Sequence, residues 1–520
     1  MWTAPSGAPK ILNRKMILIM NRLFTRRSCF QRILLGGAVV LLSFFLPSVF
    51  VKGEETTMGN IPVTLRESYK KPGENNPLYT QRFGADPGVM EYNGRLYVYM
   101  TDDIVEYDSA GKVRENSYSQ IRTINCISSE DLVNWTDHGT IRVAGPDGIA
   151  KWAVNSWAPC AAHKVVGDQE KFFLYFCNGG HGIGVLVADS PTGPWRDERG
   201  SLLITRSVKN CADVTWLFDP AVMVDEDGTG YLAFGGGVPK GKEEAPGTGR
   251  IVRLSGDMIH LDGDPVRLDI PWLFEDSGLN RIGDKYIYSY CSNWQTKGNS
   301  LGLTDGAIQY MVADHPMGPY TYAGELFPNE GRFFGLYGNN HHSIACLNGE
   351  WYLFYHNRPV EKAMGISGNY RSPQANRIIL DENGLPQQVR GTMKGLDQLK
   401  PLDPYRSVSA ATMSHQAGVS VGSVDGKSWI LGGAGSWIRV SGVDFGSSAS
   451  VLKVTAMPPT DCTLYAVLDD TDGPVASRVR VKLAEDEKPT AFSAPIQAEG
   501  IHDLYLISDG EMKLYAWNVK

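Results

Sequence analysis

WLFDPAVMVDEDGTGYLAFGGG, residues 216–237, decides the fold of this chain. Asp219 stands at the start of an apolar run, a turn rich in Asp and Gly follows, and an aromatic run comes after the turn. Two such runs on either side of an Asp/Gly turn predict a β-hairpin. The stretch therefore predicts two adjacent antiparallel strands, with one acidic side chain where the first strand begins.

The same hairpin pattern recurs along the chain. Its five copies are YNGRLYVYM (92–100), VGDQEKFFLYF (166–176), DEDGTGYLAFGG (225–236), IGDKYIYSYC (282–291) and LNGEWYLFYH (347–356). A second set of phrases, at 128–139, 188–200 and 313–324, lies between them and is expected to form outer strands. Five four-stranded units predict an all-β fold, a five-bladed β-propeller. A β-sandwich of the same strands is the alternative, but it does not explain why the phrases recur in order.

The repeat gives each hairpin an equivalent position, eight or nine residues before its turn glycine. These positions hold Asp86, Ala158, Asp219, Glu275 and His341. The innermost strands of a propeller surround one channel, so residues that begin those strands are expected to meet at one mouth of it. A single Asp-Pro at a strand entry would be ordinary turn chemistry. Three acids and a histidine in register instead predict a functional site.

Converging carboxylates favour acid–base chemistry. Acids in one pocket repel each other, so at least one is held protonated at neutral pH. A proton donor beside a carboxylate base is the equipment that splits an acetal. We expect Glu275, which apolar residues flank, to donate the proton, Asp86 to activate water, and Asp219 to keep Glu275 protonated. Opposed carboxyl groups with room for water predict inversion of the anomeric configuration.

The phrases around these acids resemble glycoside hydrolase family 43, and within it the arabinoxylan-debranching arabinofuranosidases. They are FGADPGVMEYNGRLYVYMT, NSWAPCAAHK, WLFDPAVMVDEDGTGYLAFGGG, FEDSGL, YSYCSNW, GNNHHSI and GNYRSPQ, spread over about residues 75–385. The resemblance implies an exo-acting α-L-arabinofuranosidase that removes side chains from arabinoxylan, a plant cell-wall polysaccharide. A β-xylosidase or an arabinanase of the same fold is the alternative within the family. A non-catalytic glycan-binding propeller is the alternative of another class, and the presence of all three acids argues against it.

The resemblance also assigns residues to the site. The family's base, pKa-modulating acid and proton donor fall on Asp86, Asp219 and Glu275, as the repeat predicts. The substrate contacts that it implies are Trp157, Trp216, Trp294, Asn339 and Arg371. Each Trp could instead belong to the propeller core, and Arg371 to a surface ion pair. Position 294 departs from the debranching enzymes, which tend to carry Phe there, so the resemblance leaves the pocket shape open.

A calcium ion often lies in the central channel of this family, near a histidine of the fifth blade. His341 fits that place in this sequence. Calcium prefers oxygen ligands, so one histidine with water would be an unusual site. The adjacent His342 is expected to point to the opposite face of its strand.

The propeller is expected to cover residues 54–390, and a second domain residues 400–520, after the joint LKPLDPY at 399–405. Short alternating strands there predict a jelly-roll-like β-sandwich. SWIRVSGVDFGSSAS and GIHDLYLISDG resemble carbohydrate-binding module family 6. The calcium-ligand and sugar-binding positions of that family hold Ala411 and Ala516 here, and the loop 485–495 offers only Phe492 for stacking. We therefore expect a module that packs on the propeller and binds little sugar.

Residues 1–53 predict export. A basic region precedes the apolar run ILLGGAVVLLSFFLPSVFV, residues 33–51, as in a signal peptide. An uncleaved anchor is the alternative, because about 19 apolar residues could span a bilayer. The rest of the chain is expected to be periplasmic, cell-surface or secreted, monomeric, and without further membrane contact.

The net charge and the cysteine spacing argue against some partners and some kinds of site. The net charge is −7 and no basic cluster lies outside the N-terminus, so nucleic acid is an unexpected partner. The eight cysteines include no CxxC pair, so neither a disulfide framework nor a zinc site is indicated. Cys126, Cys177 and Cys291 lie in apolar runs and are expected in the core.

Overall fold

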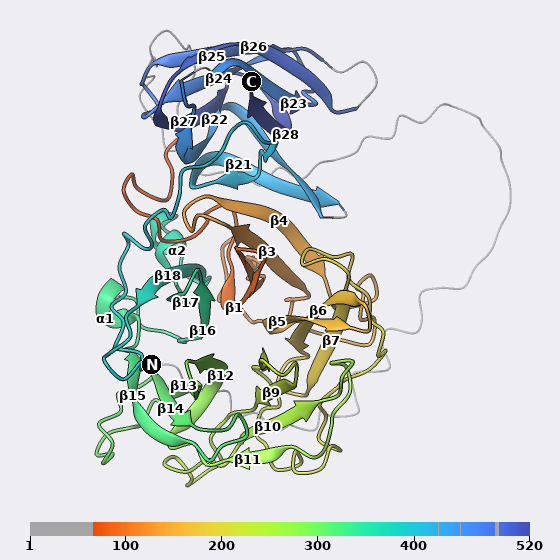
Figure 1. Cartoon of the computed structure of the whole chain (residues 1–520), viewed down its shortest axis with the longest axis vertical. Coiled ribbons are helices and arrows are strands. Elements are labelled where there is room, and N and C mark those ends of the chain that lie inside the picture. The colour runs from red at the N-terminus through yellow and green to blue at the C-terminus, as the bar shows by residue number, and fades with distance from the viewer. Residues whose placement is uncertain (1–65, 425, 448, 484–487) are drawn as a thin grey trace, which may run out of the picture. The chain divides into compact units, whose positions relative to one another are not determined.

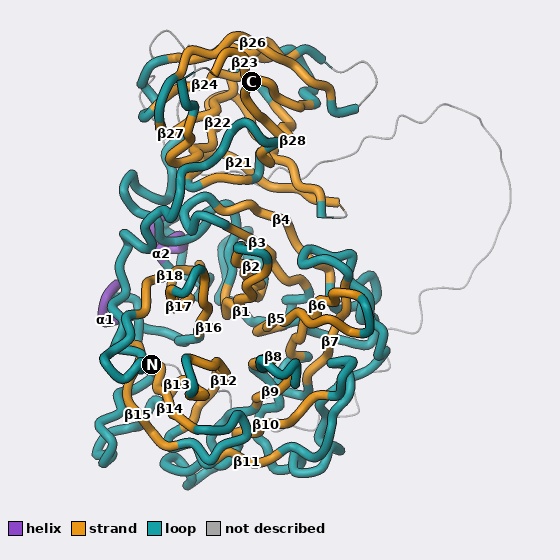
Figure 2. Tube along the Cα trace, viewed as in Figure 1, coloured by secondary structure: helices purple, strands orange, loops and turns teal. Residues whose placement is uncertain are grey.

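The computed structural model describes residues 66–424, 426–447, 449–483 and 488–520. The predicted leader, residues 1–53, lies outside the described residues. The described chain consists mostly of strands and loops, with two short helices, α1 (Gly331–Phe334) and α2 (Pro359–Ala363). Figure 2 shows that little of the described chain is helical. None of the helices in this part of the chain has the length and apolar character that a bilayer span requires.

Five antiparallel sheets follow one another and form the five-bladed β-propeller that the repeat predicts (Figure 1). The blades are β1 (Ala85–Tyr92), β2 (Arg95–Thr101), β3 (Thr123–Ser129) and β4 (Trp135–Arg142); β5 (Trp157–Val166), β6 (Gln169–Cys177) and β7 (Ile183–Ala188); β8 (Ala221–Val224), β9 (Gly230–Phe234), β10 (Gly249–Leu254) and β11 (Val266–Leu268); β12 (Leu273–Ile282), β13 (Lys285–Ser292), β14 (Ile308–Ala313) and β15 (Thr321–Phe327); and β16 (His342–Leu347), β17 (Glu350–Asn357) and β18 (Ser372–Ile378).

The innermost strands form a closed ring. β1 contacts β5, β5 contacts β8, β8 contacts β12, β12 contacts β16, and β16 returns to β1. Figure 2 shows these five strands around the centre of the propeller. Side chains at the start of each innermost strand therefore face one shared space.

Two blades depart from the four-stranded prediction. Blades 2 and 5 contain three strands each. In blade 2 the phrase 188–200 forms only an isolated bridge, between Val187 and Arg196. The other two phrases lead into the outer strands β4 and β15, as predicted.

Innermost strands begin with a backbone distortion that the sequence count did not anticipate. Asp86, Ala158, Asp219 and Asp276 all have positive φ, between 38° and 69°. The strand register shifts beside Asp86, Ala158 and Asp276, as at a β-bulge. In blade 4 this conformation belongs to Asp276, so the predicted register, which selected Glu275, is wrong by one residue. Positive φ is uncommon for residues other than Gly and concentrates at functional sites.

Residues 408–519 form the β-sandwich, in agreement with the predicted fold class. Its strands are β19 (Val408–Ser409), β20 (Thr412–Met413), β21 (His415–Val424), β22 (Lys427–Asp444), β23 (Ala449–Ala456), β24 (Cys462–Leu468), β25 (Val475–Val481), β26 (Thr490–Ala498), β27 (Ile501–Ser508) and β28 (Met512–Val519). The main sheet path runs β25-β24-β27-β22-β28-β23-β26. Its core contains Ile438, Val440, Leu452 and Trp517, all at most 1% exposed.

The sandwich segment joins blade 1 directly. β20 pairs with the outer strand β4, with Thr412 opposite Thr136 and Met413 opposite Trp135. The Asn134 side chain donates to Ser441 O at 2.8 Å and accepts from Ser441 N at 2.8 Å, and both residues are buried. The expectation that this module packs on the propeller is met by these contacts.

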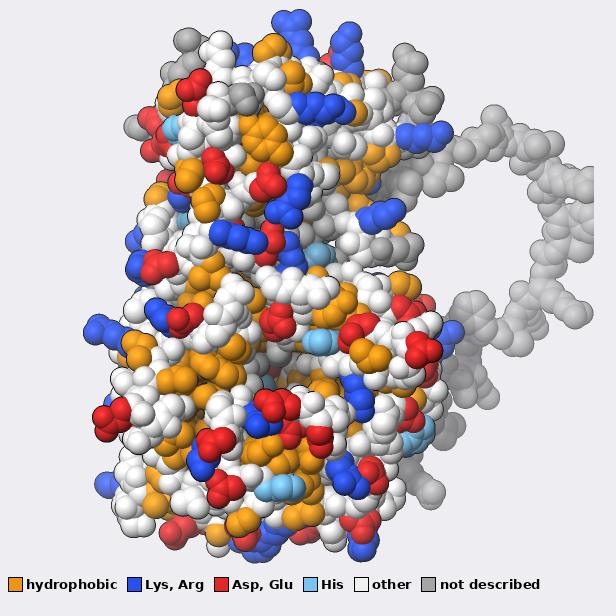
Figure 3. Space-filling model, viewed as in Figure 1, with side chains coloured by type: hydrophobic (Ala, Val, Ile, Leu, Met, Phe, Trp, Pro, Cys, Tyr) orange, Lys and Arg blue, Asp and Glu red, His pale blue; other side chains and the backbone are white. Residues whose placement is uncertain are grey.

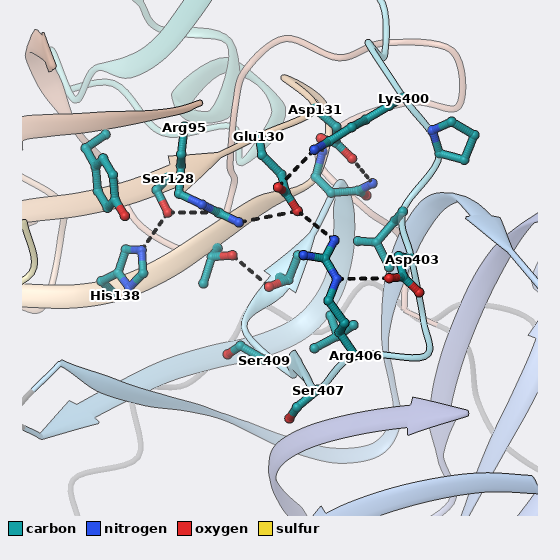
Figure 4. Close-up of a pocket in the computed structure, with 17 residues that line it drawn as sticks. Arg95, Ser128, Glu130, Asp131, His138, Lys400, Asp403, Arg406, Ser407 and Ser409 are labelled. Atoms are coloured by element: carbon teal, nitrogen blue, oxygen red, sulfur yellow. Dashed lines mark hydrogen bonds and ion pairs between the residues drawn. The ribbon is translucent and has the colours of Figure 1, made fainter. Parts of the chain in front are cut away.

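A cavity of about 310 Å³ lies where the linker passes blade 1 (Figure 4). Glu130 lies at its wall and receives a hydrogen bond from Lys400 Nζ at 3.0 Å. Arg95 and Arg406 approach the same carboxylate at 3.6 and 3.7 Å. None of the predicted site residues lines this cavity, so it belongs to the junction and not to the propeller axis.

All seven cysteines in the described residues are free, and Cys126, Cys177 and Cys291 are buried in strands, as expected. On the face drawn in Figure 3, Lys and Arg side chains are interspersed with Asp and Glu. No continuous basic surface of the kind that binds a phosphate backbone is visible on that face.

Candidate active site

His341 stands among three aspartates that come from three different blades. Its Nδ1 lies 3.6 Å from Asp86 Oδ1 and 3.9 Å from Asp219 Oδ2. Its Nε2 lies 3.1 Å from Asp276 Oδ1. All four side chains are at least nine-tenths buried as residues, so the charges meet out of bulk water. The structure therefore brings together Asp86, Asp219 and His341 as the repeat predicts, and adds Asp276.

Asp86 is held as an ionised carboxylate. Its Oδ1 accepts from Arg371 Nη1 at 2.8 Å and its Oδ2 from Thr101 Oγ1 at 2.7 Å. Burial raises the pKa of the Asp86 carboxyl, but Arg371, His341, His356 and the Thr101 hydroxyl together outweigh it and lower the pKa to about 2. An aspartate in this state can accept a proton from water.

Glu275 is held in the opposite state. Asn339 Nδ2 donates a hydrogen bond to Glu275 Oε1. Burial, followed by the charges of Asp86 and Asp276, raises the pKa of Glu275 to about 8, against the opposing effects of Asn339 and Arg371. Glu275 nevertheless keeps some exposure, whereas Asp276 beside it has none. A carboxyl that is protonated at neutral pH and accessible can donate a proton.

Asp219 is the third acid of the site. Its Oδ2 accepts from the backbone N–H of Asp276 at 3.0 Å. Burial and the charges of Glu275, Asp86 and Asp276 raise the pKa of Asp219 well above its usual range. The proximity of Asp219 and Glu275 means that ionising one disfavours ionising the other.

Arg371 connects the base to the acid. Its Nε and Nη2 donate to the two oxygens of Asp103 at 2.8 Å each. Its Nη1 donates both to Asp86 and to Asn339 Oδ1, at 2.8 and 3.0 Å. The arginine is 7% exposed, so the alternative of a surface ion pair is wrong. Through Asn339, one guanidinium fixes the positions of both Asp86 and Glu275.

The three tryptophans are half-buried, and two of them contact residues that neighbour the acids or Arg371. Trp216 makes edge contacts with Phe218 and Phe274, which directly precede Asp219 and Glu275 in the chain. Trp157 Nε1 donates to Tyr118 O at 3.0 Å, and the Arg371 guanidinium lies 5.2 Å from the Tyr118 ring centre.

Trp294 lies over Gly306. A Cβ at Gly306 would come within 2.6 Å of the indole, so only glycine fits beneath this ring. The Gly306 carbonyl in turn accepts from Asn340 Nδ2 at 3.1 Å, next to Asn339 in the chain. The indole is thus connected to the site through Gly306 and Asn340.

Sequence reasoning missed several residues of the site. Asp276 could have been found by counting six residues back from the last strand residue before the turn, a count that also gives Asp86 and His341. His356 accepts from Asp86 N at 2.9 Å through Nδ1 and donates to Asn339 O at 2.9 Å through Nε2. Burial and then the Arg371 charge lower the pKa of His356 to about 3, so it stays neutral. Thr101, Asp103 and Tyr118 carry no local signal, because only the fold brings them to Asp86 and Arg371.

His342 also contacts a residue of the site. Its Nδ1 lies 2.5 Å from Asp276 Oδ2 and its Nε2 lies 2.6 Å from Ser289 Oγ. Strand alternation predicts that His341 and His342 diverge, but the Asp276 carboxylate is turned inward at the bulge and contacts both. Burial lowers the pKa of His342 to about 3. His342 is therefore a neutral hydrogen-bonding partner of the site.

The described surroundings of His341 offer few protein ligands for a metal ion. Among the described residues, no group of three or more His, Cys, Asp and Glu side chains has the arrangement of a metal site. Asp276 Oδ1 is buried without a hydrogen-bond donor, and it lies 3.1 Å from His341 Nε2. That spacing suits neighbouring ligands of one ion with bonds of about 2.3–2.6 Å. A calcium ion would thus fit at His341 only with water as most of its ligands.

A propeller whose axis holds an ionised aspartate, a protonated glutamate and a third acid has the equipment of a glycoside hydrolase. Residues 74–386 match the model of Glycosyl hydrolases family 43, and the chain belongs to this family.

Two relatives are similar over most of their length. The arabinoxylan arabinofuranohydrolase of Paenibacillus polymyxa is 42% identical over 92% of this chain and 79% of its own. That of Bacillus subtilis (strain 168) is 40% identical over 85% of this chain and 90% of its own. A solved structure of a family 43 arabinoxylan arabinofuranohydrolase from Bacillus subtilis, in complex with cellotetraose, has a TM-score of 0.85 and 38% identity, over 87% of this chain and 99% of that chain.

Proposed function

We propose that this glycoside hydrolase is an exo-acting, inverting α-L-arabinofuranosidase that removes arabinose side chains from arabinoxylan. The observation that carries the proposal is the pairing of an ionised Asp86 with a protonated Glu275 through the Arg371–Asn339 bridge. The similarity to two arabinoxylan arabinofuranohydrolases over most of the chain supports the choice of substrate.

In the proposed reaction Asp86 removes a proton from water, and the water oxygen attacks the anomeric carbon. Glu275 gives its proton to the glycosidic oxygen as the bond from that oxygen to the anomeric carbon breaks. The products are free arabinose of inverted configuration and the shortened polymer, and the enzyme then exchanges protons with solvent. Asp219 shares the buried pocket with Glu275, and an ionised Asp219 would disfavour ionisation of the donor, because ionising one of two neighbouring acids disfavours ionising the other.

The remaining side chains would bind and orient substrate. We expect Trp157, Trp216 and Trp294 to contact the flat faces of sugar rings, and Asn339 and Arg371 to contact hydroxyl groups. Because Asn339 and Arg371 also hold the two reacting carboxyls, a sugar hydroxyl bound by them would be positioned relative to both.

A calcium ion at His341, completed by water, is part of the proposal. When bound, it would supply positive charge among Asp86, Asp219 and Asp276 and reduce their repulsion. The undonated oxygen of Asp276 beside His341 supports this placement.

We also propose that the enzyme is exported and works as a monomer on plant cell-wall polysaccharide, with the sandwich acting mainly as a structural partner of blade 1. The paired strands β20 and β4 support that role.

Pentose release from a panel of substrates tests the proposal. Purified enzyme is incubated with arabinoxylan, arabinan, xylan and the aryl α-L-arabinofuranoside and β-D-xyloside, and the products are identified. We expect arabinose from arabinoxylan as the main product. Xylose as the main product would favour a β-xylosidase, shortened arabinan chains would favour an arabinanase, and binding without release would reject an enzyme.

A further inference from the structure

An exposed tyrosine precedes by two residues Asn339, which bonds the proton donor. The loop between α1 and β16 carries Asn339 and His341 into the site, and Tyr337 is part of it. Tyr337 is 62% exposed, more than any other large hydrophobic side chain in the described part of the chain. Single exposed hydrophobic residues are common and by themselves mean little. What distinguishes Tyr337 is how firmly its loop is held.

Four consecutive backbone carbonyls of this loop each accept a hydrogen bond from a side chain. The donors are Asn357 Nδ2 to Leu336 O at 3.0 Å, Arg358 Nη2 to Tyr337 O at 2.8 Å, Asn329 Nδ2 to Gly338 O at 3.0 Å, and His356 Nε2 to Asn339 O at 2.9 Å. A loop that is fixed by its own carbonyls loses little conformational entropy when a ligand binds. The loop is thus preorganised.

The Tyr337 side chain packs closely against Gly331. A Cβ at Gly331 would lie 2.3 Å from Tyr337 Cγ and 2.7 Å from its Cα. The ring therefore rests on a glycine that leaves no room for a side chain, and it remains largely exposed to solvent. A rigid aromatic ring with an exposed surface can stack on the apolar face of a sugar ring.

The position of Tyr337 in the loop indicates which part of the substrate it could contact. Asn339 bonds Glu275 and lies two residues further along, so its Cα is within about 7 Å of that of Tyr337. If Glu275 protonates the glycosidic oxygen, the leaving group lies on the side of Glu275 and Asn339. Tyr337 is then close enough along the loop to meet the leaving group.

We propose that Tyr337 is a stacking platform for a xylopyranose ring of the polymer backbone, next to the substituted residue, and that it sets the preference for polymer over small arabinosides. The inference rests on the proposed function, because the leaving group of a debranching enzyme is the backbone. It requires no contact between Tyr337 and the reacting carboxyls.

The test compares Tyr337→Ala, Tyr337→Phe and wild-type enzyme on arabinoxylan and on an aryl α-L-arabinofuranoside. We expect Tyr337→Ala to lose about 5-fold in kcat/KM on arabinoxylan, mainly through KM, and to keep its activity on the aryl substrate. Tyr337→Phe should retain activity on both, because the ring and not the hydroxyl provides the platform. An unsubstituted xylo-oligosaccharide should inhibit wild-type enzyme competitively, with a Ki about 5-fold higher in Tyr337→Ala.

Tyr69→Ala, at another exposed tyrosine, is the matched control and should leave kcat/KM unchanged on both substrates. Equal losses on both substrates in Tyr337→Ala, or no loss on the polymer, would overturn the inference. These outcomes are distinct from failure of the proposed function, in which wild-type enzyme releases no arabinose from arabinoxylan. If another pentose is released, the same comparison of polymer with aryl pentoside still decides the role of Tyr337.

Discussion

Asn339 and Glu275 are joined by a hydrogen bond from the amide nitrogen of one to the carboxyl oxygen of the other. The amide oxygen of Asn339 is already bound by Arg371, so the orientation of the amide is fixed. Asn339 can therefore only donate to Glu275. In the proposed reaction this donor stabilises the carboxylate that remains after proton transfer, and the acid itself is kept neutral by burial and by neighbouring charges.

Replacing Glu275 should separate catalysis from stability. Glu275→Gln should lose about 10²–10⁴-fold in activity on arabinoxylan, and less on an aryl arabinoside with an acidic leaving group, because that group needs little protonation. It should also raise Tm at pH 7 by about 2 °C or more, because folding no longer requires a carboxyl to take up a proton. Both changes are read from initial rates and a thermal melt. Equal losses on the two substrates would show that Glu275 is not the proton donor.

The pH dependence follows from the two shifted carboxyls. The pKa of Glu275 is raised to about 8, so the protonated donor is present below that pH and is lost as the pH rises through it. The pKa of Asp86 is lowered to about 2, so the ionised base is lost only as the pH falls through that value. A plot of kcat/KM against pH should therefore be flat through the mildly acidic range and fall near pH 8. An alkaline limb below pH 6 would contradict the assignment.

Asn339→Asp should test the bridge. A second carboxyl beside Glu275 repels its ionised form, so the alkaline limb should move to higher pH. Activity at the plateau should fall about 10-fold or more, because the donor to Glu275 is gone. Asn339→Ala serves as the comparison, since it removes the donor without adding charge and should not produce the same upward shift. An unchanged profile in Asn339→Asp would show that Asn339 does not influence Glu275.

Metal removal should distinguish the roles of the two adjacent histidines, His341 and His342. If calcium is held at His341, a chelator should lower both activity and Tm, and calcium should restore them. His341→Ala should then lose activity that calcium cannot restore. His342→Ala should instead destabilise the fold with or without chelator, because Asp276 and Ser289 lose a buried partner. A chelator without effect on either quantity would remove calcium from the proposal.

Deleting residues 405–520 should cost stability more than catalysis. The deletion exposes the edge of β4 and leaves the Asn134 side chain without both Ser441 partners. We expect a lower Tm and lower solubility, with kcat on an aryl arabinoside within about 2-fold of wild type per folded molecule. Asn134→Ala in the full chain should lower Tm alone, because each buried group left unpaired costs about 1–3 kcal/mol of stability. Strong retention of the isolated sandwich in a xylan gel would contradict its structural role.

The fold could be predicted because the hairpins repeat in order, and the acids because they stand at equivalent places. The register could be read only to within one residue. The bulges at Asp86 and Asp276 cannot be located by counting from a turn glycine. The count therefore selects Glu275, although Asp276 is the residue that shares the positive φ of Asp86. The partners of Arg371 could not be predicted, because Asp103 and Asp86 are 268 and 285 residues away and only the ring of blades joins them.

The pairing of β20 with β4 has a consequence in time. Thr136 and Thr412 are 276 residues apart, so blade 1 receives its fifth strand long after its first four have been made. At about 5–20 residues per second, synthesis of the intervening chain takes roughly 14 to 55 seconds. During that interval the outer edge of β4 offers unpaired N–H and C=O groups to any other extended chain nearby. Strand β20 thus pairs with the edge that β4 leaves open. A nascent chain that stalls before residue 412 would leave that edge unpaired and able to pair with another chain.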